Sequence, residues 1–195
     1  ICVLFLAEDE GFVEATARVG LDGVEGASDV VVADFDADAF LDLLFLGRSP
    51  RLFRNERGHM RPQPFAGGDP GWAASVGTAC DADGDGRIDV VLAGRDLALA
   101  RNRTADAGAW VVLSLTRHER PPIGALVRAT YADGSVHVCR VGSTHRGHLA
   151  QSHGAIALAC PSENPLRQLE VRFPGGERRV TAVSGPGPVR LEADQ

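Results

Sequence analysis

Two acidic nine-residue segments constrain the fold of this chain more than any other feature of its sequence. They read DFDADAFLD from Asp34 and DADGDGRID from Asp81, so carboxylates fall at relative positions 1, 3, 5 and 9 in both. Side-chain oxygens at positions 1, 3 and 5, a backbone carbonyl at 7 and a carboxylate at 9 can surround one calcium ion. The predicted ligands are the side chains of Asp34, Asp36, Asp38, Asp42, Asp81, Asp83, Asp85 and Asp89, with the carbonyl oxygens of Phe40 and Arg87.

The residues around these loops predict strands. An EF-hand needs a glutamate at position 12 and flanking helices, but Phe45 and Leu92 stand at position 12, inside apolar runs. The alternative is a pair of Asp-rich surface turns without a cation. Ala37 and Ala39 replace the loop glycines of the second segment, and alanine resists positive φ. We therefore expect the first loop to bind calcium more weakly or under strain.

The two segments belong to an internal repeat with an offset of 47 residues. Gly47 falls on Gly94, and the offset continues to later pairs: Leu52 on Leu99, Arg54 on Arg101 and Asn55 on Asn102. The same shift toward the N-terminus places Gly11 on Gly58 and Gly20 on Gly67. Residues 1–20 are thus expected to be the tail of an earlier copy, and the 195 residues a piece of a longer chain.

Repeats of this length, made of short strands and Gly/Asp turns, are typical of β-propeller blades. Residues 1–104 supply too few blades to close a ring, so we expect the remaining blades to come from a longer chain or an oligomer. The strings VVVADFDADAFLDLLFLG and VGTACDADGDGRIDVVLAG, together with LFRNERGHM, resemble FG-GAP or VCBS repeats of integrin α-subunit-type propellers. That resemblance implies calcium on the blade.

A second region, residues 105–195, follows the repeats and is predicted to be a small β-sandwich or barrel. Hairpin signals lie at ADGS near Asp133 and at PGGE near Gly175. The strings AWVVLSL, IGALVRATYADG, HVCRVGS and LEVRFPGG resemble the ASPIC/UnbV domain that follows such repeats in cartilage acidic protein-like sequences. The predicted architecture is therefore all-β, a partial propeller followed by a sandwich-like domain.

Charge and hydropathy exclude some classes of protein. With 20 basic and 26 acidic residues the net charge is −6, and no basic run is visible, so we expect no nucleic-acid partner. No apolar run reaches the roughly 18 residues that a membrane-spanning helix needs, so no membrane span is expected.

Other candidate chemistry is sparse. His145, His148 and Gln151 are the weak candidates for a catalytic or metal-binding cluster, and incidental loop histidines are the alternative. Cys139 and Cys160 either form a disulfide in an exported protein or remain buried free thiols. The sequence contains no recognisable catalytic constellation, and the interpretation leans away from an enzyme.

The function expected from the sequence is that of a calcium-binding scaffold or binding protein for a protein or a hydrophobic small molecule. The resemblance implies two settings. Bacterial UnbV-type proteins are encoded with enediyne polyketide biosynthesis genes, which indicates a cytoplasmic accessory protein, or an enzyme that holds a polyene intermediate between repeats and C-terminal domain. Animal members are adhesion-type proteins, which indicates an extracellular location.

Overall fold

The fold of the protein is built almost wholly from short β-strands. The structure is a computed structural model that describes residues 2–65, 73–104, 108–118, 120–142 and 155–193. Within these ranges one helix occurs, α1 (Thr16–Val19), which is four residues long. The predicted all-β class is confirmed. The same ranges contain no helix that is both long and apolar enough to cross a membrane.

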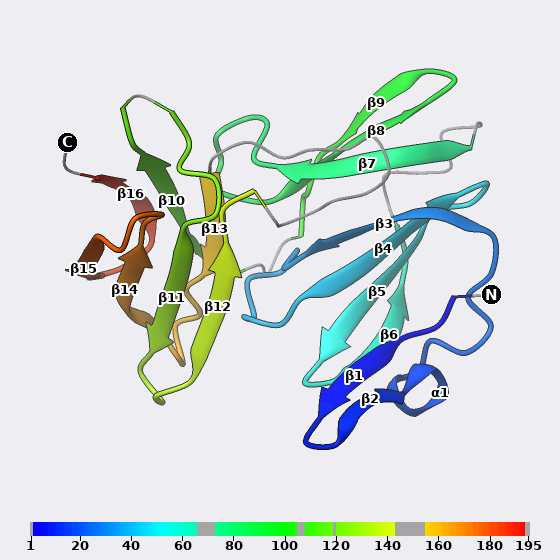
Figure 1. Cartoon of the computed structure of the whole chain (residues 1–195). Helices are drawn as coiled ribbons and strands as arrows, with labels where there is room; N and C mark the ends of the chain where they lie inside the picture. The colour runs from blue at the N-terminus through cyan, green and yellow to red at the C-terminus, as the bar shows by residue number, and fades with distance from the viewer. Residues whose placement is uncertain (1, 66–72, 105–107, 119, 143–154, 194–195) are drawn as a thin grey trace.

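Three antiparallel sheets form the N-terminal half (Figure 1). The first is a hairpin, and the other two are meanders in which consecutive strands are neighbours. Their strands are β1 (Phe5–Glu8) and β2 (Gly11–Glu14); β3 (Ala27–Ala33), β4 (Asp42–Gly47), β5 (Arg51–Glu56) and β6 (His59–Gln63); and β7 (Ala74–Cys80), β8 (Asp89–Gly94) and β9 (Leu97–Ala100).

The repeat predicted from the sequence extends to the pairing of individual residues. In the β3–β4 pair Ala27 lies opposite Gly47, and in the β7–β8 pair Ala74 lies opposite Gly94, which is a shift of 47 residues in both strands. Each pair also has an irregularity after its first residue, at the same place in the repeat. The two units are therefore structural copies of one another in their first three strands.

The β1–β2 hairpin corresponds to β5–β6, but with an offset of 48 instead of 47. Glu8 pairs with Gly11 across one turn, and Glu56 pairs with His59 across the other. The predicted match of Gly11 with Gly58 is thus wrong by one residue, because the two turns align on their strands and not on their glycines. Gly67, the predicted partner of Gly20, lies outside the described residues.

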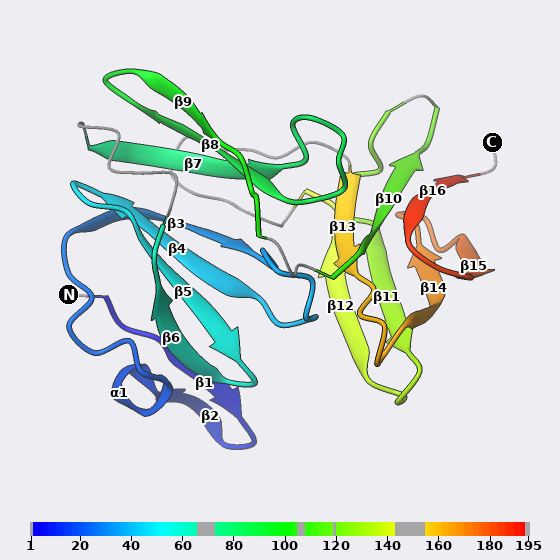
Figure 2. The same ribbon diagram turned by 180° about the vertical axis from the view of Figure 1, so that it is seen from behind.

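The two meander sheets pack closely against each other, as both views show (Figures 1 and 2). Val31, Leu44 and Leu92 belong to one buried cluster that joins them. A Cβ atom at Gly77 would lie 2.7 Å from Leu46 Cδ1 and 3.0 Å from Val31 Cγ2, so an added methyl group would force these two side chains to shift. The described sheets do not close into a ring, and the propeller remains a proposal.

Two sheets form the C-terminal half and share one core. The strands of the first are β13 (Ala155–Ala159), β10 (Trp110–Thr116) and β16 (Gly187–Glu192), and those of the second are β12 (Val136–Arg140), β11 (Leu126–Tyr131), β14 (Leu166–Arg172) and β15 (Arg178–Ala182). Leu113 of the first sheet and Val127 and Leu169 of the second are fully buried in the same cluster. Both predicted hairpins, β11–β12 and β14–β15, are confirmed.

No sheet combines described strands from both sides of residue 104. The domain limits 1–104 and 105–195 themselves stay a prediction. Cys139 and Cys160 are free thiols that both lie in the C-terminal core.

Candidate metal centres

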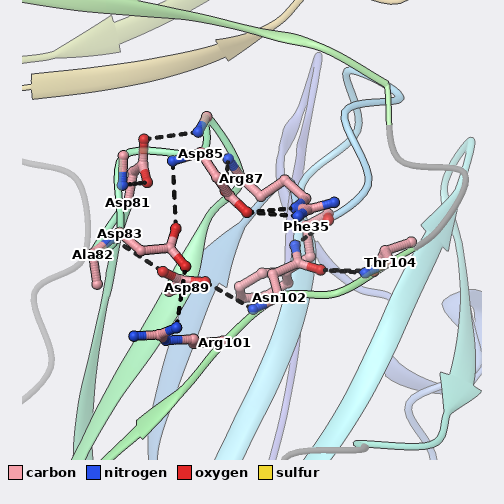
Figure 3. A network of polar contacts seen from close by, with 12 residues as sticks. Phe35, Asp81, Ala82, Asp83, Asp85, Arg87, Asp89, Arg101, Asn102 and Thr104 are labelled. Atoms are coloured by element: carbon pink, nitrogen blue, oxygen red, sulfur yellow. Dashed lines mark hydrogen bonds and ion pairs between the residues drawn. The ribbon is translucent and has the colours of Figure 1, made fainter.

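Each acidic loop connects the first two strands of a repeat unit and is shaped by its own carboxylates. At position 1, Asp34 Oδ2 accepts a hydrogen bond of 2.9 Å from the backbone amide of Ala39, and Asp81 Oδ2 accepts one of 3.0 Å from Gly86. In each loop this bond curls the backbone around the carboxylate at position 1. Figure 3 shows this network in the second loop.

Three carboxylates converge in each loop, but the two sets differ. Oxygens of Asp34, Asp36 and Asp42 lie within 4.8 Å of one another in the first loop. The corresponding set in the second loop is Asp81, Asp83 and Asp85. Such groups of oxygen ligands suit a hard divalent cation. Exposed acidic residues also gather without any ion, so the convergence alone does not establish a site.

The aspartate at position 9 ties its loop to an asparagine in the third strand of the first unit, Asn55 of β5, or just after the third strand of the second, Asn102 after the end of β9. Asp42 Oδ2 accepts the amide of the second loop residue, Phe35, at 2.9 Å, and Asp42 Oδ1 accepts the amide of Asn55 at 2.8 Å. Asp89 makes the same two contacts, with its Oδ1 bonded to the amide of Asn102 at 2.7 Å. Both aspartates are 1% exposed. Both carboxylates therefore hold the structure of the loop by accepting two backbone hydrogen bonds each.

Asp38 and the two carbonyl positions are less clearly placed. Asp38 Oδ1 accepts the amide of Phe40 at 2.8 Å, and its carboxylate is outside the converging set. Asp85 Oδ1 makes the equivalent bond with Arg87 at 2.9 Å, yet Asp85 belongs to its set. The proposed roles of the Phe40 and Arg87 carbonyl oxygens stay predictions.

An arginine at the same repeat position contacts the middle carboxylate of each loop. Arg54 forms an ion pair with Asp36, and Arg101 Nη1 lies 3.7 Å from Asp83 Oδ2. The 47-residue offset had already aligned these arginines, but sequence alone gave them no role. Each arginine supplies one positive charge to a loop with three converging carboxylates, so it neutralises the negative charge of that loop only in part.

Burial raises the pKa values of the first loop. It is the largest cause of the shift of Asp34 to about 7 and of Asp42 to about 6, and the nearby Asp38 carboxylate adds to both. In the second loop the pKa of Asp85 is lowered by hydrogen bonds from Arg87, first from its backbone amide and then from its side chain. The first loop therefore resists ionisation, whereas the second is open to water.

The middle carboxylate of the first loop is buried and paired. Asp36 is 7% exposed, and its carboxylate forms an ion pair with Arg54. The three converging carboxylates of Asp34, Asp36 and Asp42 exceed this single positive charge, and their oxygens are the kind of donor that calcium takes. These residues therefore fit the ion.

The alanines of the first loop adopt the left-handed conformation that the sequence comparison indicated. Ala37 has φ 59° and Ala39 φ 74°, against 75° and 85° for Gly84 and Gly86 at the same positions of the second loop. A left-handed alanine costs about 1 kcal/mol relative to glycine. The strain expected for the first loop is therefore present in its backbone.

The first loop also contacts the end of the second repeat unit, at Asn102, and the C-terminal half, at Gly108 and Trp110. Its carbonyl oxygens at Asp34, Phe35 and Asp36 accept hydrogen bonds in turn from Trp110 Nε1 at 3.3 Å, Asn102 Nδ2 at 2.6 Å and Gly108 N at 2.8 Å. Ala37 is 1% exposed in the same cluster as Trp110. Local sequence spacing does not predict these contacts, because they join residues 67 or more positions apart.

An open cleft of about 660 Å³ separates the second loop from the C-terminal half. Its lining includes Asp81, Asp85, Arg87, Trp110, Val112 and Pro188. His145, His148 and Gln151, the candidates for catalysis, lie outside the described residues.

No known protein-family model matches the chain, and no curated protein is similar to it at a significant level. The resemblance to FG-GAP or VCBS repeats and to the ASPIC/UnbV domain therefore remains an expectation from the sequence strings.

Proposed function

We propose that this chain is a calcium-stabilised β-repeat protein with a binding or scaffold role. The observation that carries the proposal is the repetition of one loop design in two different sequences. Positions 1, 5 and 9 make equivalent hydrogen bonds in both loops, and position 3 contacts an arginine in both. Ordinary surface turns have no reason to gather three carboxylates in each of two loops that share these contacts.

Calcium is the preferred occupant because the available donors are all oxygens. Calcium takes six to eight oxygen ligands in flexible geometry, whereas magnesium demands a tighter octahedron and keeps several waters. The resemblance to calcium-bearing FG-GAP or VCBS blades supports the same ion. With a dissociation constant near 0.1 mM and roughly 2 mM free calcium, one site would contribute about 1.8 kcal/mol to the free energy of unfolding.

The cellular setting follows from that affinity. A site with a dissociation constant of about 0.1 to 1 mM is loaded outside the cell and nearly empty in the cytoplasm. An extracellular adhesion-type role therefore requires only weak sites, and a cytoplasmic role in enediyne biosynthesis requires tighter ones. In either setting the remaining blades of the propeller are proposed to come from a longer chain or from an oligomer.

A biosynthetic enzyme is the second candidate, and the observation that favours it is the open cleft beside the second loop. A hydrophobic intermediate bound there would contact Val112 and Pro188. Loss of product on replacing His145, His148 and Gln151 together would support this candidate, and full product would remove it.

Thermal unfolding tests the leading proposal. The melting temperature should rise when calcium replaces a chelator, and the rise should shrink in the Asp83→Asn, Asp85→Asn variant. Asp96→Asn is the matched control, because Asp96 is an exposed aspartate outside the loops whose ion pair with Arg95 lies at the surface. An identical melting temperature with and without calcium would contradict the proposal.

A further inference from the structure

The outward face of the second C-terminal sheet combines arginine and valine side chains. Residues alternate between the two faces of a strand, and Val127, Leu169 and Val171 point into the core, so their neighbours point outward. Of the outward residues, seven are exposed arginines or valines, which we call the arginine face: Arg128, Arg140, Arg172, Arg178, Val136, Val138 and Val180. Figure 1 shows the four strands side by side.

The strand register brings the arginines together. Arg172 of β14 lies directly opposite Arg178 of β15, and Leu126 of β11 lies opposite both Arg172 and Arg140. Arg128 is two residues further along β11, on the same side of the sheet. Positive charge from all four strands is thus concentrated on one surface.

A single carboxylate, Glu170, lies among these outward residues. It accepts hydrogen bonds from Arg178 Nε at 2.8 Å and Nη2 at 2.9 Å, and Arg128 and Arg172 also act on it electrostatically. Arg128, Arg172 and Arg178 against Glu170 leave a surplus of two positive charges on this face, in a chain whose net charge is −6. Like charges directly opposite each other, as at Arg172 and Arg178, destabilise a sheet. The hydrogen bonds between Arg178 and Glu170 offset part of this repulsion.

Aliphatic side chains lie beside the charges. Val138 is 54% exposed and Val180 51% exposed, and they are opposite Arg128 and Glu170 respectively. A polyanion such as a sulfated polysaccharide would neutralise the arginines and leave the valines in water. A protein surface that carries both carboxylates and aliphatic groups would cover both kinds of side chain.

We propose that the arginine face is a docking surface for an acidic protein segment that presents carboxylates and aliphatic side chains together. Arginine suits this task because its planar guanidinium binds a carboxylate through two hydrogen bonds. The inference is independent of calcium, since none of its residues belongs to the acidic loops.

Fluorescence anisotropy with labelled peptides tests the proposal on the full chain. The probe is a 12-residue peptide of alternating glutamate and leucine, and the comparison peptide alternates glutamate and serine. We expect the first to bind at least about tenfold more tightly. Arg128→Gln with Arg172→Gln should weaken binding about tenfold or more, and Val138→Thr about threefold. Arg190→Gln, an exposed arginine on β16 of the other sheet, is the control and should change binding less than about twofold.

Four results of the binding measurements would overturn the inference. They are no binding of the glutamate–leucine peptide, equal binding of both peptides, tighter binding of heparin than of either peptide, and equal binding by the doubly substituted and unaltered chains. Self-association that Arg128→Gln with Arg172→Gln abolishes would identify a second copy as the occupant and would also contradict it. Circular dichroism melting of each variant separates lost binding from lost folding.

Discussion

The backbone amide of Gly108 donates a hydrogen bond of 2.8 Å to the carbonyl oxygen of Asp36, and this bond ties the first acidic loop to the segment that leads into the C-terminal half. Gly108 is also in close contact with the next loop residue, Ala37. A Cβ atom at Gly108 would lie 2.7 Å from the carbonyl oxygen of Ala37 and 3.0 Å from its Cβ. The first loop is therefore both a candidate metal centre and part of the packing between the two halves.

Gly108→Ala should destabilise the protein. The added methyl must displace the backbone of Ala37, and overpacking of this kind costs about 1 to 3 kcal/mol. Urea unfolding measures the change. Gly185→Ala is the matched control, since a Cβ at Gly185 has no neighbour within 4 Å. Equal effects of the two substitutions would show that the contact between Gly108 and Ala37 does not matter for stability.

Exchanging alanine and glycine at one repeat position should have opposite effects in the two loops. Ala39→Gly relieves a φ of 74° and should stabilise the first loop by about 0.5 to 1 kcal/mol. Gly86→Ala at the equivalent position, with φ 85° and open space around its Cβ, should destabilise the second loop by a similar amount. Denaturant unfolding of both variants checks the sign, and the same sign in both would refute the strain argument.

The position-9 aspartates should be needed for folding even without a cation. Asp89→Asn keeps the shape of the side chain but replaces one of two oxygens that accept amides of Ala82 and Asn102. Loss of one buried hydrogen bond, with an amide group left facing an amide donor, costs about 1 to 3 kcal/mol. Unfolding in the presence of chelator measures this cost. An unchanged midpoint would mean that Asp89 acts only as a metal ligand.

The calcium-free protein should become more stable as the pH falls from about 7 to about 4. The folded pKa values of Asp34 and Asp42, about 7 and about 6, lie above the unfolded value near 3.9. The folded state therefore binds these protons more tightly than the unfolded state does. The resulting gain in the free energy of unfolding is complete below the unfolded pKa and is lost as the pH rises through the folded pKa values. Melting temperatures in chelator across this range give the test. A midpoint that falls steadily on acidification would contradict the assigned burial of these groups.

Sequence reasoning recovered the features that depend on local spacing and missed those that depend on distant contacts. The 47-residue offset predicted that Ala37 and Ala39 stand where Gly84 and Gly86 adopt positive φ, and all four do. Asp34 lies in the repeat half and Trp110 in the C-terminal half, so the 47-residue offset does not predict the hydrogen bond between them.

The different roles of the aspartates within each loop were also not predictable from the sequence. A 1, 3, 5, 9 pattern treats Asp42 and Asp89 alike as ligands, although both also accept the backbone amide of an asparagine, Asn55 and Asn102 respectively. Only Asp42 joins a converging set. The alignment of Gly11 with Gly58 is likewise one residue out of register, because the strand pairing places Gly11 at the position of His59.

Calcium binding itself is the central claim, and isothermal titration calorimetry of the metal-free protein tests it most directly. The account predicts two binding events, with the glycine-containing second loop binding more tightly than the strained first loop. Asp83→Asn with Asp85→Asn should remove the tighter event and leave the weaker one. The absence of any calcium binding by the unaltered protein at millimolar concentration would contradict the account.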